Sequence, residues 1–241
     1  LYGNTLYHNF VLDDYIAITG NEFTKKGISG IKDLMTHDAF VGTYGEALEL
    51  TGGRYRPLSM VLFAIEYELF GLNPHIGHFG NVLLFAISCV LIYCLFRKIS
   101  PGNDGLFPFT AALLFTVHPI HTEVVANIKS RDEILVLLLL TITVILSLKS
   151  KSHHKYFLAP VIFFLALLSK ENAITFLAVI PLALYCFANK KTTQIMKQML
   201  PLLLVTAVYL WMRAEFAGMV GDRTTADIMD DPYLHAALYE K

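Results

Sequence analysis

Long apolar runs separated by short polar segments dominate the chain from residue 78 onward. The first run, His78 to Phe96, contains no charged residue and is closed by Arg97 and Lys98. About 20 apolar residues suffice for a helix to cross the ~30 Å hydrocarbon core of a bilayer. The pattern predicts an all-α fold, a polytopic transmembrane helix bundle of about six spans. The later runs cover residues 106–117, 134–148, 156–168, 173–188 and 199–212.

The chain before the first span has a different pattern. Residues 1–76 contain no spanning run but show apolar positions at helical spacing. Pro57 stands where a helix begins, and we expect this helix to lie along the membrane surface. Its apolar face comprises Leu58, Val61, Leu62, Ile65 and Leu69.

These patterns predict three parts: an external loop with juxtamembrane helices over 1–76, a transmembrane bundle over 77–216, and the start of the next external loop over 217–241. Because the chain starts at Leu1 and stops without a closing element, we expect a fragment truncated at both ends.

Composition supports an integral, multi-pass membrane protein. The chain is 55% hydrophobic and 16% charged, whereas soluble domains carry about 25% charged residues. The formal net charge of −1 gives no reason to expect a nucleic-acid partner.

The charge of the connecting segments predicts orientation. Alternate connections are basic, and by the positive-inside rule they face the cytoplasm. The polar clusters at residues 13–14, 118–132 and 170–171 are then expected to share the opposite, non-cytoplasmic face. The basic connections carry Arg97 and Lys98, then Lys149, Lys151 and Lys155, then Lys190, Lys191 and Lys197.

Asp13 and Asp14 form an adjacent carboxylate pair at the end of an apolar lead-in. Charge held at the edge of a bilayer is costly, which makes the pair a candidate catalytic site. A solvated turn or a helix cap is the structural alternative.

His118, His121 and Glu123 offer two imidazoles and a carboxylate. They could bind a divalent cation, although Pro119 interrupts the helix that would align both rings. Hydrogen-bonded positioning of a substrate or loop is the other interpretation. No cofactor is certain from the sequence.

Charged residues at other span boundaries are candidates for substrate binding. Asp132 can cap the helix that begins beside it, while Arg131 suits an anionic partner, either a carboxylate or a phosphate. Lys170 and Glu171 could form an ion pair at a span boundary. Arg56, close to Arg54, could hold a lipid headgroup or a donor phosphate.

Several local strings together resemble the transmembrane-and-TPR-containing (TMTC-like) O-mannosyltransferases and their bacterial relatives in the GT-C superfamily. They cover nearly the whole chain in order, and the HPIHTE string with its downstream RD and KE is the most specific part. The strings are Asp13-Asp14-Tyr15, Tyr55-Arg56-Pro57-Leu58, Phe70-Gly71-Leu72-Asn73-Pro74, His118-Pro119-Ile120-His121-Thr122-Glu123, Ser130-Arg131-Asp132 and Ser169-Lys170-Glu171-Asn172.

The resemblance implies a GT-C-like fold and transfer of a sugar, with mannose as the candidate, from a polyprenyl-phosphate donor. The acceptor would be a protein Ser/Thr hydroxyl or a glycan hydroxyl on the non-cytoplasmic face. It implies that an acid in the first external loop, Asp13 or Asp14 with Asp13 favoured, serves as base. TPR repeats would follow downstream. The membrane would be the inner or plasma membrane in a bacterium and the endoplasmic reticulum in a eukaryote.

The chemistry is consistent with these residues. One carboxylate can take the proton of the acceptor hydroxyl, and a lipid phosphate leaving group needs cationic stabilisation. A single base predicts inversion at the anomeric carbon. The alternatives are a transporter or flippase of a lipid-linked substrate, whose charges would line a pathway, and a membrane metallohydrolase using His118, His121 and Glu123.

Overall fold

The structure is a computed structural model that describes residues 1–45, 54–100, 102, 105–148 and 153–217. Its first part consists of short helical segments joined by turns. They are η1 (Gly3–Tyr7), η2 (Tyr15–Thr19), α1 (Glu22–Lys25), η3 (Gly27–Gly30), α2 (Ile31–Thr36) and α3 (Val41–Tyr44).

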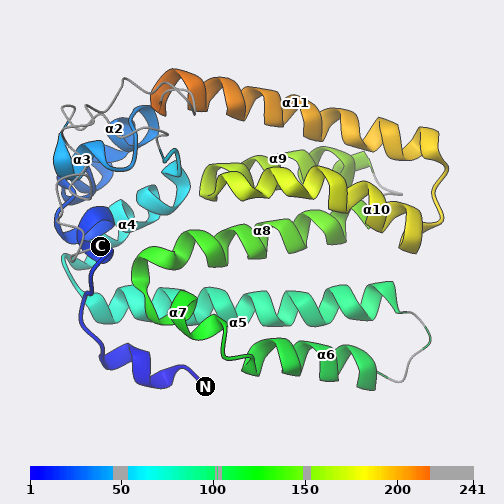
Figure 1. Cartoon of the computed structure of the whole chain (residues 1–241), viewed down its shortest axis with the longest axis horizontal. Coiled ribbons are helices and arrows are strands. Elements are labelled where there is room, and N and C mark those ends of the chain that lie inside the picture. The colour runs from blue at the N-terminus through cyan, green and yellow to red at the C-terminus, as the bar shows by residue number, and fades with distance from the viewer. Residues whose placement is uncertain (46–53, 101, 103–104, 149–152, 218–241) are drawn as a thin grey trace, which may run out of the picture.

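The remainder is a bundle of longer helices that run back and forth along one direction (Figure 1). Helix α6 begins and ends at the residues that the apolar pattern predicts, whereas α5, α8, α9 and α11 extend beyond the predicted runs. The elements are α4 (Pro57–Phe70), α5 (Pro74–Ile99), α6 (Leu106–Val117), α7 (His121–Ala126), η4 (Ile128–Ser130), α8 (Arg131–Leu148), α9 (His153–Ser169), η5 (Glu171–Thr175), α10 (Phe176–Ala188) and α11 (Thr192–Ala217).

Within the described residues, three segments are long and apolar enough to cross a membrane: Pro74–Ile99, Glu171–Ala188 and Thr192–Ala217. Leu106–Val117 and Phe157–Ser169 are shorter apolar helices. The protein is therefore an all-α membrane helix bundle, as predicted. The division into parts at residues 76 and 216 stays a prediction, and residues 218–241 of the predicted last loop lie outside the described residues.

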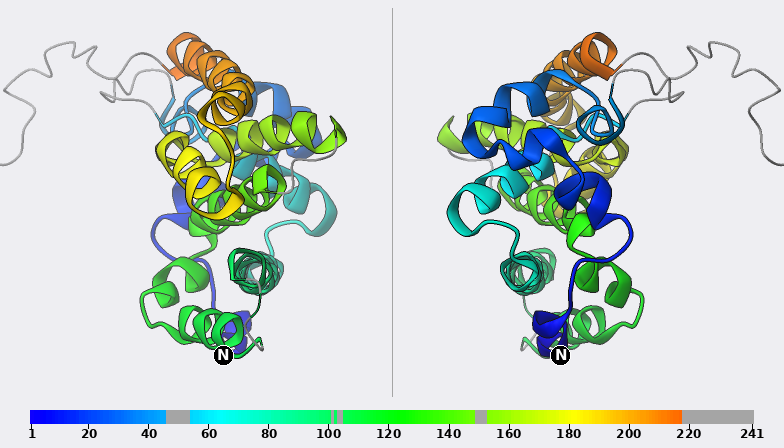
Figure 2. Two further views of the ribbon diagram at one scale, coloured as in Figure 1. Left: turned by 90° about the vertical axis from the view of Figure 1, so that its right-hand side faces the viewer. Right: turned by 90° about the vertical axis from the view of Figure 1, so that its left-hand side faces the viewer.

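The two ends of the bundle differ in content. Figures 1 and 2 show α1 to α4 gathered at the end where α5, α8 and α10 begin. Arg97, Lys98, Lys190 and Lys191 lie toward the opposite end, at or just beyond the ends of α5 and α10. The first and third predicted basic connections thus lie at one end of the bundle, whereas Lys149 and Lys151 of the second lie outside the described residues and the orientation stays a prediction.

The main core lies between α8, α9, α10 and α11. Phe163, Leu167 and Leu184 are fully buried there, and Tyr55 extends this core to the loop before α4. A second cluster joins Met60, Phe63 and Ala64 of α4 to the N-terminal segments and Ile128. The segments that carry Ala17, Ile18 and Leu34 are therefore packed on the bundle through α4, whereas Tyr2 packs on Phe85 of α5.

Helix α4 begins at Pro57, as expected, because proline at the first helical position needs no hydrogen-bond acceptor. Its buried face is formed by Ser59, Met60, Phe63 and Ala64. The stripe predicted from spacing, of which Leu58 and Leu62 are members, is only partly buried, and Leu69 is exposed. Leu58 and Val61 of this stripe pack against the two core clusters, so the predicted position of the helix along the membrane surface stays a prediction.

Arg131 fixes three helices around one buried charge. Only 1% of it is exposed. Its guanidinium donates to Glu66 of α4 at 2.6 Å and to the Asn81 side chain and the Gly77 carbonyl of α5, each at 2.9 Å. It also lies 4.6 Å from the centre of the Phe63 ring.

Replacing Arg131 is expected to destabilise the fold. Removing one partner of a buried charge pair costs about 3–5 kcal/mol because the other charge is left without compensation. We expect Arg131→Met to lower the unfolding temperature in detergent strongly. Arg97→Met, at the opposite end, removes a more exposed guanidinium that donates to the Tyr93 hydroxyl at 3.4 Å within the described residues, and it should change the unfolding temperature little. Equal unfolding temperatures for the two variants would contradict this role.

Candidate functional site

The two adjacent aspartates have different surroundings. Asp14 is fully buried. Its carboxylate accepts the backbone N–H of Val11 at 2.9 Å and that of Lys129 at 2.8 Å. Burial raises the pKa of the Asp14 carboxyl above its ordinary value, and these two hydrogen bonds offset part of the shift. Asp14 thus ties the first loop to η4.

Asp13 faces outward from the same turn. More than half of its side chain, 54%, is exposed, and its Oδ2 lies 3.5 Å from Nζ of Lys129. The preceding residue, Leu12, has a φ of 33° and is 92% exposed. A leucine in this left-handed region is strained. The turn therefore presents Asp13 to solvent while Asp14 holds it in place.

Arg56 connects segments that are far apart in the sequence. It stands immediately before α4 and donates to Asp132 at 2.8 Å and to both oxygens of Glu171, at 2.7 and 3.1 Å. Burial opposes the charge of Arg56, but Glu171 and Asp132 outweigh it and raise the pKa of the guanidinium. We call these three residues the Arg56 clasp.

The remaining predicted basic residues are also paired. Lys170 forms an ion pair with Glu133 at the start of α8. Arg131 is enclosed by the contacts described above. In this arrangement Arg56, Arg131 and Lys170 all bind carboxylates, so their predicted contact with a donor phosphate stays a prediction.

The histidine cluster lies apart from these pairs. The ring of His121 packs on Phe115 and Phe85, with centroids 4.3 and 5.4 Å away. Burial, followed by the neighbouring His118, lowers the pKa of His121. His118 accepts the N–H of Ile120 at 3.2 Å, and Glu123 is exposed.

No described group of three or more His, Cys, Asp or Glu side chains converges on a point that could hold a metal ion. The rings of His118 and His121 are 6.0 Å apart. The metallohydrolase interpretation therefore gains no geometric support, and a divalent cation remains only a sequence-based hypothesis.

A cleft opens beside the Arg56 clasp. It contains about 370 Å³ of empty space, part of it open to solvent. Its charged lining is Arg54, Arg56, Lys129 and Asp132. Its apolar lining is Ile16, Ala17, Ala39, Phe40, Met60 and Phe63, with Ser59 between them. We call it the cationic cleft.

Sequence reasoning did not single out Lys129. It lies in the polar turn between α7 and α8, and no motif distinguishes it from an ordinary surface lysine. Its position becomes clear only in the fold, where Lys129 lines the cationic cleft and its ammonium pairs with Asp13. Among the candidate residues from the polar clusters that the sequence predicts on one face, Asp13, His118, Arg131 and Lys170 do not line this cleft.

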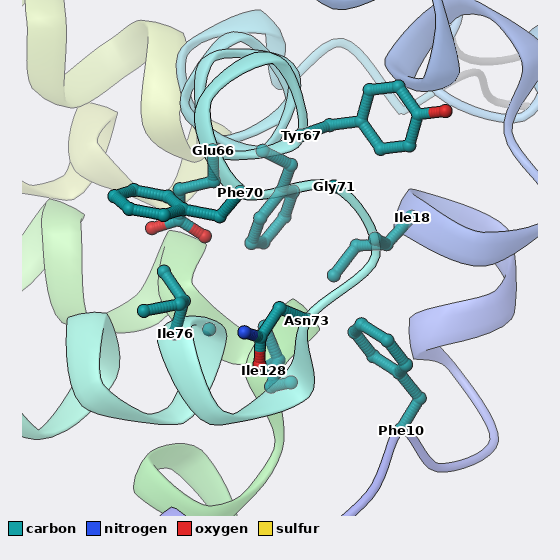
Figure 3. A pocket seen from close by; sticks show the side chains of 11 residues that line it. Phe10, Ile18, Glu66, Tyr67, Phe70, Gly71, Asn73, Ile76 and Ile128 are labelled. Carbon is teal, nitrogen blue, oxygen red and sulfur yellow. The ribbon is translucent and has the colours of Figure 1, made fainter.

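A second cleft, which Phe63 also lines, has about 290 Å³ of empty space. Figure 3 shows Phe10 and Ile18 on one side of it, with Phe70, Glu66 and Ile76 on the other. The lining is mainly aromatic and aliphatic. Its carboxylate, Glu66, is already bound to Arg131.

Comparison with known proteins identifies the family of the chain. Residues 56–215 match the family described as dolichyl-phosphate-mannose-protein mannosyltransferase. The match begins at Arg56 and leaves Asp13 and Asp14 outside it.

Among curated relatives, Protein O-mannosyl-transferase TMTC1 of Homo sapiens is 38% identical over 138 residues, covering 57% of this chain and 15% of that protein. Protein O-mannosyl-transferase TMTC2 of Homo sapiens is 34% identical over 194 residues, covering 74% of this chain and 22% of that protein. Protein O-mannosyl-transferase Tmtc1 of Drosophila melanogaster is 32% identical over 180 residues, covering 73% of this chain and 20% of that protein. The chain thus aligns with less than a quarter of each relative. No solved structure matches it.

The raised pKa of Asp14 predicts a pH-dependent stability. Because the folded carboxyl keeps its proton to higher pH than the unfolded one, its contribution to the free energy of unfolding falls as pH rises from 3.8 to the raised value. Above that value the contribution is constant.

Asparagine at this position does not titrate. The unfolding free energy of the wild type minus that of Asp14→Asn should therefore decrease through this acidic window and then level off. Denaturant titrations of both proteins at several pH values measure the difference, and other titrating groups cancel in it. A difference that is flat or rises with pH would show that burial does not govern this carboxyl.

Proposed function

Because the chain belongs to the dolichyl-phosphate-mannose-protein mannosyltransferase family, we propose that it is part of a multi-pass membrane glycosyltransferase. The enzyme would move a sugar from a polyprenyl-phosphate donor to a protein hydroxyl, and the family description indicates that this sugar is mannose. The observation that carries this proposal is Asp13, a half-exposed carboxylate whose ion-pair partner, Lys129, lines the cationic cleft.

The carboxylate suits the role of base. The acceptor hydroxyl must lose its proton as its oxygen attacks the anomeric carbon. Asp13 is open to an incoming acceptor, whereas Asp14 is enclosed and occupied by two backbone donors. We therefore assign proton transfer to Asp13 and the fixing of the turn to Asp14. A single base implies inversion at the anomeric carbon.

The cationic cleft suits a lipid phosphate. Arg54 and Lys129 supply positive charge beside the Arg56 clasp, and Phe40, Met60 and Phe63 supply apolar wall for the first units of a polyprenyl chain. A phosphate leaving group is already a stable anion, so fixed cations stabilise it without a general acid. Arg54 lies over the Phe40 ring, 4.9 Å from its centre.

The placement of charge favours transfer over transport. The ion pairs of Asp13, Arg56, Arg131 and Lys170 all join elements at the end of the bundle that carries α1 to α4. A transport pathway would need polar groups along the length of the bundle. We propose that this end faces the non-cytoplasmic side, because the opposite end carries Arg97, Lys98, Lys190 and Lys191.

Removing the base should abolish most transfer. We expect Asp13→Asn in the full-length protein to lower the rate of sugar transfer from a labelled polyprenyl-phosphate donor by about 10²–10⁴-fold, the usual contribution of a general base. Its donor KM and unfolding temperature should change much less, since the carboxylate is half-exposed.

Asp33→Asn is the matched control. Asp33 is a partly exposed aspartate of the N-terminal part, paired with Lys26 at 2.8 Å, and it lines neither cleft. This variant should transfer at the wild-type rate. Wild-type transfer by Asp13→Asn would remove the proposed base.

A further inference from the structure

Lys129 is held in two ways that differ in rigidity. Its backbone N–H donates to Asp14 at 2.8 Å and to the Asn127 side chain at 3.1 Å. Its ammonium lies 3.5 Å from Asp13, which is longer than a good N–H···O hydrogen bond. The main chain is thus fixed, while the contact between the ammonium and Asp13 is a loose ion pair.

Lys129 is also one of the residues that line the cationic cleft, so an anion bound there would lie near the cation that pairs with Asp13. The other cleft cations are held differently. Arg56 is bound by two carboxylates, and Arg54 is stacked on Phe40. A lysine ammonium is a compact charge on a flexible stem and can exchange partners more readily than an arginine fork.

We propose that Asp13 and the donor phosphate compete for Lys129, so that arrival of the donor releases the base. This inference rests on the proposed function and adds a regulatory step to the same site. Without donor, Lys129 neutralises Asp13. With donor in the cleft, Lys129 turns to the phosphate and Asp13 is left free to accept a proton.

In the transfer step, each bond that forms is matched by a bond that breaks. The acceptor oxygen forms a bond to the anomeric carbon, and its proton passes to Asp13. The bond between that carbon and the phosphate oxygen breaks, and the phosphate keeps the electron pair. The lipid phosphate gains negative charge as it leaves, so its attraction for Lys129 grows along the reaction.

A double-mutant cycle on binding tests the competition without relying on transfer. The probe is a short-chain polyprenyl phosphate without sugar, titrated into full-length protein in nanodiscs of constant phospholipid composition. We expect Asp13→Asn to tighten binding about two- to five-fold, because an exposed ion pair has about that strength. In a Lys129→Met background, Asp13→Asn should give no tightening.

Lys25→Met provides the matched control. The Lys25 side chain is 28% exposed and pairs with Glu22 at 2.6 Å, much as Lys129 is 23% exposed and pairs with Asp13. In the Lys25→Met background the tightening by Asp13→Asn should persist. Because Asp14 accepts the backbone N–H of Lys129, substitution of the Lys129 side chain leaves that contact possible, and unfolding temperatures without probe verify it.

The outcomes separate the two proposals. Equal tightening with and without the Lys129 side chain, or no tightening in either, would overturn the competition while leaving the glycosyltransferase proposal intact. A wild-type protein that does not bind the probe overturns both. If the probe binds and the cycle shows the expected coupling but no sugar is transferred, the shared cation stands and the proposed function fails.

Discussion

Charged groups that are buried at the end of an apolar bundle are stable only when other protein groups satisfy them, and this constraint organises the polar end of the molecule. The described clusters meet it with oppositely charged partners drawn from distant segments. Arg56 binds residues 76 and 115 positions away. Arg131 binds a residue 65 positions away. Each pair joins different helices, so the ion pairs also determine how the helices are arranged at this end.

This constraint separates two kinds of charge. Arg131 is almost fully enclosed and satisfied by three acceptors and an aromatic ring, which suits a structural role. Asp13 and Lys129 are both partly exposed and meet at a longer distance. A tightly bound charge is costly to move, whereas a loose exposed pair costs little to separate. The groups suited to chemistry are therefore those that the fold holds least firmly.

Much of this arrangement follows from the sequence, because it depends on one-dimensional patterns. Apolar runs predict the helices, and α6 agrees at both ends. The alternation of basic connections predicts that residues 13–14, 118–132 and 170–171 share one end. Which charged residues pair with one another cannot be predicted in the same way, since the pairing depends on how the helices rotate and pack. The sequence offered Arg56, Asp132 and Glu171 as separate candidates, and only the fold shows that they neutralise one another.

The two aspartates show why adjacency in sequence leaves roles undecided. Both are acids in one turn, and the sequence favours Asp13 only through family resemblance. In the fold, the turn sends one carboxylate inward to two backbone N–H groups and the other outward to an ammonium. Lys129 contacts both aspartates: its backbone N–H donates to Asp14, and its ammonium pairs with Asp13. The element that fixes the turn thus also carries the cation that faces the base, so changes at η4 act on the geometry and the charge of Asp13 together.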